Sequence, residues 1–357
     1  MSTDIPAEAL PVSQRSRKRF WASDLRTARI VRFSVGVTTA TAIAFGFNWP
    51  LFFLTPLFTA VFLALPLPAP TLKQGLHYII DVFAAFALGL VFTLFLLPYP
   101  LVYVPALGLV LFQIYYLANR GGPVFLVLMS LVAVLILPML GMAYEALAIV
   151  FVLYFAWSAV LAIVFVILAH GLFPDPPSQH PALRRGSFQP GYSREAALTA
   201  LKSTVAILPI AILFIASNWT GQILIMVFAA IFSLSPELSK GKGAALKSLT
   251  STLIGGFAAV VFFYLIVAVP EFHFFIALML LTTLLFGSGI FSDKPLAKYL
   301  SSAVTALIVL IGGSMGENVS ITDKFAIRVV LTGAAVLYVV GVLTVLDHVW
   351  PRRNQGG

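Results

Sequence analysis

Long apolar stretches recur along the whole chain and constrain its fold more than any other feature. A helix needs about 20 mostly apolar residues to cross the roughly 30 Å of hydrocarbon in a bilayer. Because the stretches are unbroken rather than alternating, and a backbone in lipid must satisfy its own hydrogen bonds, we expect helices and not strands. The sequence therefore predicts an all-α membrane protein with about twelve transmembrane helices. The predicted spans are 31–48, 51–66, 78–97, 101–118, 123–143, 146–170, 201–217, 220–235, 246–268, 271–289, 296–315 and 325–347.

The chain also repeats itself. The stretch 48–77 aligns without a gap with the stretch 218–247. The pairs that match there include Asn48 with Asn218, Trp49 with Trp219, Phe58 with Phe228, Phe62 with Phe232, Pro66 with Pro236 and Leu76 with Leu246. Outside this window Arg32 falls on Lys202 and His170 on His348. Self-similarity at a fixed spacing is typical of a duplicated structural unit.

This duplication predicts the domain organisation. We expect a six-helix repeat over 31–170 and a second over 195–350, joined by a linker at 171–194 that is rich in Pro and Gly. A basic arm at 1–30 and a tail at 351–357 flank them. Because each repeat has an even number of helices, both insert in the same orientation, as two parallel repeats. A pseudo-twofold axis along the membrane normal relates such repeats and favours a pathway along it.

The charge balance indicates how the chain is oriented. The chain has 22 Lys and Arg against 13 Asp and Glu, and a net charge of +9. In a membrane protein such an excess marks the cytoplasmic loops, so it does not by itself predict nucleic-acid binding. The predicted outer loops hold Glu145, Glu271, Glu317, Asp323 and a single lysine, Lys324. We therefore expect both termini to be cytoplasmic.

Motifs for catalysis are missing from the sequence. The chain has no cysteine, and the stretch GKGAAL at 241–246 lacks the spacing of a nucleotide-binding P-loop. No HExxH motif or carboxylate–histidine cluster with metal spacing occurs, so we expect no enzyme activity, no metal site and no cofactor. If the protein moves a solute against its gradient, the protonmotive force is the expected energy source.

Two duplicated cations are the first candidate site residues. Arg32 and Lys202 lie just inside the start of matching apolar runs. Two positive charges that face a central cavity would concentrate organic anions. The alternative is that both side chains extend to the inner headgroups.

The first predicted helix, RFSVGVTTATAIAFG, is unusually rich in small and polar residues, and Thr38 and Thr41 are its candidate substrate contacts. The alternative is close helix packing through small residues. The spans 51–66 and 220–235 are short, and Pro56 interrupts the first of them. Short or proline-interrupted spans at matching positions favour a nearby substrate site.

Asn48 and Asn218 follow matching helices at the predicted outer side and are further candidate contacts. Their repetition also predicts a turn or helix cap that the fold requires. Asp81 is the one acidic residue well inside an apolar run, HYIIDVFAAFALGL. Intramembrane acids favour a functional role, here as a proton carrier. The alternative is an interfacial carboxylate paired with Lys73 or Arg32.

The duplicated plan, the RFSVGVTTATAIAFGFNWP stretch and the SPELSKGKGAALKSL stretch resemble the fusaric acid resistance-like inner-membrane proteins, most closely their short subgroup without a large soluble domain. The resemblance spans 29–348. It implies an efflux component of the bacterial inner membrane for aromatic or other organic acids, which works with a HlyD-like periplasmic adaptor.

We therefore expect an exporter of small organic acids, aromatic ones above all, or of amphiphilic toxic compounds. Arg32 and Lys202 would attract the substrate and Asp81 would carry protons. One alternative is a passive organic-anion channel, whose currents persist without a proton gradient. The other is a membrane scaffold that assembles an adaptor and transports nothing.

Overall fold

The computed structural model describes residues 25–65, 68–174, 191–217 and 242–314, with seven single positions between 326 and 345. Every regular element in these ranges is an α-helix. The helices are α2 (Leu25–Phe47), α3 (Leu54–Ala64), α4 (Leu72–Leu96), α5 (Pro100–Asn119), α6 (Val124–Ala143), α7 (Glu145–Leu172), α8 (Arg194–Ala216), α10 (Lys242–Ala268), α11 (Phe272–Ile290) and α12 (Ala297–Ser314).

Within the described ranges, eight helices are long and apolar enough to cross a membrane. They are α2, α4, α5, α6, α7, α8, α10 and α11, and the shorter apolar helices are α3 and α12. These helices confirm the expectation of an α-helical membrane protein. The predicted span 220–235 lies outside the described residues, and so does most of the span 325–347.

Two helices begin well before the apolar runs that predicted them. α4 begins at Leu72 rather than at residue 78, because Thr71 and Gln74 form a capping box over its first turn. α8 begins at Arg194 rather than at residue 201, and the Ser193 side chain accepts a hydrogen bond from the amide of Ala196. A search for apolar residues misses such first turns because their side chains are polar.

α3 is too short to span a bilayer. Its 11 residues rise about 16 Å, roughly half the thickness of the hydrocarbon. Pro56 lies in the first turn of α3, where a proline costs little, so it marks the start of the helix and does not interrupt it. The chain reaches α3 through a tight connection after α2, in which Asn48 and Leu51 have φ angles of 48° and 60°.

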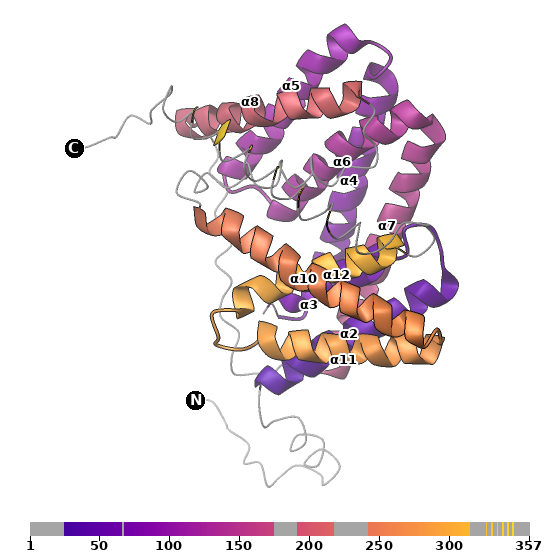
Figure 1. Cartoon of the computed structure of the whole chain (residues 1–357). Helices are drawn as coiled ribbons and strands as arrows, with labels where there is room; N and C mark the ends of the chain where they lie inside the picture. The colour runs from indigo at the N-terminus through magenta and orange to yellow at the C-terminus, as the bar shows by residue number, and fades with distance from the viewer. Residues whose placement is uncertain are drawn as a thin grey trace, which may run out of the picture.

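The helices pack in pairs that join distant parts of the chain. α2 packs along α11, and α5 packs along α8, on opposite sides of the molecule (Figure 1). α4 packs against α6, and α10 against α12. α7 lies between these groups and contacts α2, α3, α4 and α6.

Small residues allow the closest of these contacts. A Cβ added at Gly89 of α4 would lie 2.9 Å from the Cβ of Ala133 on α6. A Cβ added at Gly255 of α10 would overlap the carbonyl oxygen of Ala303 on α12. Both helix pairs therefore pack backbone to backbone, which is typical of helices associated in a membrane.

Candidate functional site

The two duplicated cations are both buried. Arg32 on α2 is 2% exposed and Lys202 on α8 is 7% exposed. Each lies two turns or so from the start of its helix, within the part of the chain that the structure describes. A charged side chain inside a membrane protein is energetically costly and is normally kept for a purpose.

Arg32 also holds the end of another helix. Its Nη1 donates a hydrogen bond of 3.2 Å to the carbonyl oxygen of Phe173, the residue that terminates α7. The unpaired carbonyls at a helix C-terminus carry partial negative charge, so a guanidinium is favourable there. His170 lies in the same last turn of α7 and is buried, with its Nδ1 2.8 Å from the carbonyl oxygen of Val166.

The hydroxyl groups of α2 form hydrogen bonds both to a neighbouring helix and within α2. The Oγ1 of Thr38 lies 3.2 Å from the Oγ1 of Thr283 on α11. Ser34 donates to the carbonyl of Ile30 within its own helix, and Thr41 donates to that of Val37. This geometry is that of two helices joined through small polar residues.

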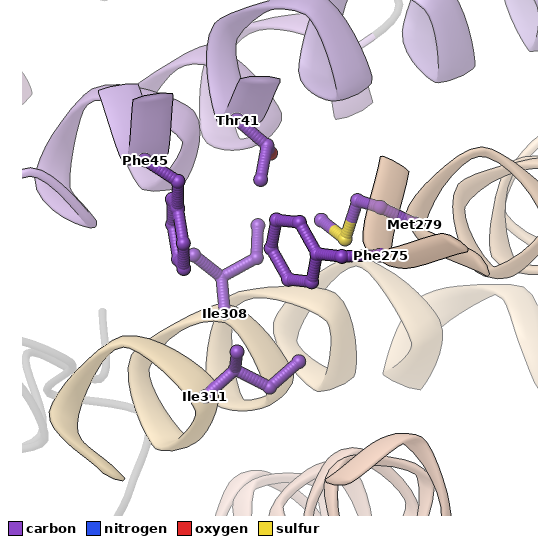
Figure 2. Close-up of a pocket in the computed structure, with 6 residues that line it drawn as sticks. All are labelled: Thr41, Phe45, Phe275, Met279, Ile308 and Ile311. Atoms are coloured by element: carbon purple, nitrogen blue, oxygen red, sulfur yellow. The ribbon is translucent and has the colours of Figure 1, made fainter. Parts of the chain in front are cut away.

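A small pocket lies where α2, α11 and α12 meet (Figure 2). It encloses about 180 Å³ of empty space, part of which is open to the outside. Apart from Thr41 its lining is apolar, and the lining residues are Thr41, Phe45, Phe275, Met279, Ile308 and Ile311. Because the Thr41 hydroxyl already donates to Val37, the pocket offers a ligand little polar contact.

Asp81 lies away from the two cations in the fold. It is half-buried on α4, which packs against α6 and α7. Its neighbours Ile80 and Phe83 are 54% and 49% exposed, so Asp81 lies at the border between the packed face of α4 and its outward face. His77 precedes it by one turn on the same side of the helix.

Asn48 directly follows α2, and its positive φ of 48° places it in the left-handed region. Its backbone N–H donates to the carbonyl of Ala44, which closes the last turn of the helix. Asparagine tolerates this conformation better than most residues do. The matching Asn218 lies outside the described residues.

The described Lys and Arg residues gather at one end of the helices, the basic end. Arg26 of α2 donates to the carbonyl of Ser288 at the end of α11, and the amide of Ser193 before α8 donates to Tyr116 at the end of α5. These contacts, with that of Arg32, bring the starts of α2 and α8 level with the ends of α5, α7 and α11. The cations at this end are Arg26, Arg29, Arg32, Lys73, Arg120, Arg194, Lys202, Lys294 and Lys298. The connections described at the opposite end contain Glu145 and Glu271 and neither Lys nor Arg.

The candidate residues within the described ranges lie on three helices or directly after one. Arg32, Thr38 and Thr41 share α2, with Asn48 at its end, whereas Lys202 lies on α8 and Asp81 on α4. Thr283 was not predicted, because nothing in the sequence near it shows that α11 packs along α2. The sequence singled out His170 only through its match with His348. Its burial could not be predicted, because it depends on how α7 packs.

The fold and its apolar helices define the class of a multi-pass α-helical membrane protein. Residues 29–169, which run from the first turns of α2 almost to the end of α7, match the model of a family described as "Protein of unknown function (DUF2955)". No curated protein matches the chain. No solved structure matches it either.

Proposed function

We propose that this protein is an inner-membrane efflux transporter for small organic acids or amphiphilic compounds, built from two parallel six-helix repeats. Export would be driven by the protonmotive force and coupled to a periplasmic adaptor of the HlyD-like kind. The likeness to the fusaric acid resistance-like proteins, stated from the sequence, suggests aromatic acids as the substrate class.

The pairing of the helices supports the duplicated plan. If α2 to α7 correspond in order to the helices that begin with α8, then the contact of α4 with α6 corresponds to that of α10 with α12. The contact of α2 with α11 corresponds in the same way to that of α8 with α5. A twofold relation between parallel repeats explains both correspondences. The family match over 29–169 covers nearly the same residues as the first predicted repeat.

The observation that carries the transport proposal is the burial of Arg32 and Lys202 at matching places on α2 and α8. A helix-end contact explains the burial of Arg32, but snorkelling to the headgroups explains neither side chain, since both lie inside the molecule. We propose that these two buried cations, on the first helices of the two repeats, attract the anionic substrate.

The distribution of charge supports an orientation with the basic end, and hence the N- and C-termini, in the cytoplasm. Substrate would then enter at the end where Arg32 and Lys202 lie. Asp81, on a separate helix, is the proposed proton carrier, because a carboxyl at the edge of a packed helix face can exchange protons with the same compartment.

Flux in proteoliposomes tests the proposal. We expect Arg32→Gln and Lys202→Gln each to reduce export of an aromatic acid at least tenfold, and Asp81→Asn to abolish its dependence on a proton gradient. Lys73→Gln is the matched control, since Lys73 is an exposed cation at the same end. Unchanged flux in the first three variants contradicts the site assignment, and flux that persists without any gradient indicates a passive anion channel instead.

One observation favours a second candidate, a scaffold that assembles an adaptor and transports nothing. The described helices enclose apolar clusters, and the pocket between α2, α11 and α12 is almost entirely apolar (Figure 2). Adaptor binding without flux of any tested acid would support this alternative.

A further inference from the structure

The first helix of each predicted repeat has a long contact with a helix of the other repeat. α2 opens the first repeat, but it lies along α11, which belongs to the second. α8 opens the second repeat, but it lies along α5 and also touches α6, which belong to the first. Figure 1 shows these two pairs on opposite sides of the molecule.

The contact between α2 and α11 extends along both helices. Near one end, Arg26 donates to the carbonyl of Ser288 at 3.0 Å. In the middle, Thr38 and Thr283 meet through their hydroxyl groups at 3.2 Å. Near the other end, the rings of Phe45 and Phe275 lie 4.9 Å apart between centroids.

The contact between α5 and α8 is also extended. A Cβ added at Gly108 would lie 3.3 Å from the Cδ2 of Leu208, so the two helices approach closely at their centres. At their ends the amide of Ser193 donates to the Tyr116 hydroxyl at 3.1 Å. One buried cluster joins residues of α5, α6 and α8.

We propose that two rigid bodies in this protein can move against each other, and that each body contains helices from both predicted repeats. We call this arrangement the interlock. One body contains α2, α10, α11 and α12, and the other contains α4, α5, α6 and α8. α3 packs against α2 and α12 of the first body, and its Leu54 also joins a buried cluster with α4 and α6 of the second, so α3 lies between the bodies. α7 connects the bodies, since it contacts α2 and α3 on one side and α4 and α6 on the other.

The physical reason is the size of the surface that would have to separate. If the bodies were the sequence halves, motion between them would part α2 from α11 along both helices. It would break the contacts of Arg26 with Ser288, Thr38 with Thr283 and Phe45 with Phe275 together. Motion between the composite bodies leaves both long contacts intact.

A disulfide tests the interlock, because the chain contains no cysteine of its own. We would place Thr38→Cys with Thr283→Cys in the full chain, with a specific protease site inserted between residues 175 and 190. After oxidation in the membrane and cleavage, we expect one full-length species on a non-reducing gel. Thr38→Cys with Thr282→Cys is the matched control, since Thr282 precedes Thr283 and its hydroxyl donates to Leu278 within α11. The control should yield two fragments.

Two results would overturn the interlock. One is separation of the Thr38/Thr283 variant into fragments as complete as in the control. The other is a band of two joined chains before cleavage, which would place the α2–α11 contact between molecules. Gly108→Cys with Leu208→Cys tests the reciprocal contact by the same assay and replaces the first pair if that variant does not fold.

The assignment of the moving bodies rests on the proposed transport and has its own readout. Oxidation of the Gly108/Leu208 variant should change its flux in proteoliposomes less than twofold, because the bond lies inside one body. Complete loss of flux on oxidation, with recovery on reduction, would show that α5 and α8 must separate. If the unmodified chain gives no flux, the transport proposal fails while the gel assay still decides the interlock.

Discussion

At the scale of single residues, the polar side chains of α2 act in the structure as contacts between helices. Arg32 binds the carbonyl that ends α7, and Thr38 meets Thr283 on α11. The sequence showed these residue types. It also left open whether such residues contact a substrate or pack against a neighbouring helix. The partners that these side chains contact in the fold lie about 140 and 245 positions further along the chain.

Asn48 gives a prediction at this scale. Asn48→Ala should lower the free energy of unfolding by about 1 kcal/mol, because alanine lacks the short polar side chain with which asparagine offsets the cost of the left-handed conformation. Asn48→Gly should cost less than Asn48→Ala, since glycine adopts a positive φ freely. Thermal unfolding in detergent measures both. Equal destabilisation by the two variants would show that the asparagine side chain, and not the turn, is what stabilises the end of α2.

At the scale of elements, the helices pack through glycines whose missing side chains leave room for a neighbour. A Cβ at Gly36 of α2 would lie 2.6 Å from the Cδ1 of Leu63 on α3 and 3.1 Å from the Cβ of Ala169 on α7. Three helices therefore meet at this glycine. The sequence showed that α2 is rich in small residues, but it did not show which of them face a neighbouring helix.

Gly36→Ala should destabilise the protein by about 1–3 kcal/mol, since a methyl group added to a filled contact forces the helices apart. Gly46→Ala is the control on the same helix, because its nearest neighbour is the Phe272 ring at 3.7 Å, an ordinary contact distance. We expect Gly46→Ala to be neutral or to stabilise by up to about 1 kcal/mol, the usual gain when alanine replaces glycine in a helix. A melting temperature unchanged by Gly36→Ala would contradict the packing of α2 against α3 and α7.

The helix boundaries illustrate the same limit of prediction. The apolar runs located the described helices, but Thr71 and Ser193 extend α4 and α8 by several polar residues. The short α3 follows from the turns at Asn48 and Leu51, which use up part of the predicted span. Capping and turn formation are local, so closer attention to these residues would have found them from the sequence.

At the scale of the whole molecule, charge separates the two ends of the helix bundle. This gives a topology prediction that needs no knowledge of the substrate. Single cysteines at Glu145 and Glu271 should react in intact cells with a thiol reagent that does not cross the membrane. Cysteines at Lys73 and Lys298 should react only after the cells are opened. Labelling of only the cysteines at Lys73 and Lys298 in intact cells would show the reverse orientation. Labelling of all four cysteines in intact cells would contradict the proposed topology.

The sequence by itself determined that the chain lies in a lipid bilayer and that its spans are helical. An unbroken apolar run in a bilayer can satisfy its backbone hydrogen bonds internally only as a helix. The sequence also showed the match between 48–77 and 218–247, since the similarity of two stretches is a property of the sequence alone. Only the tertiary structure decided that α2 packs along α11 and α8 along α5, because lipid-facing and helix-facing apolar residues look alike when the solvent is itself a hydrocarbon.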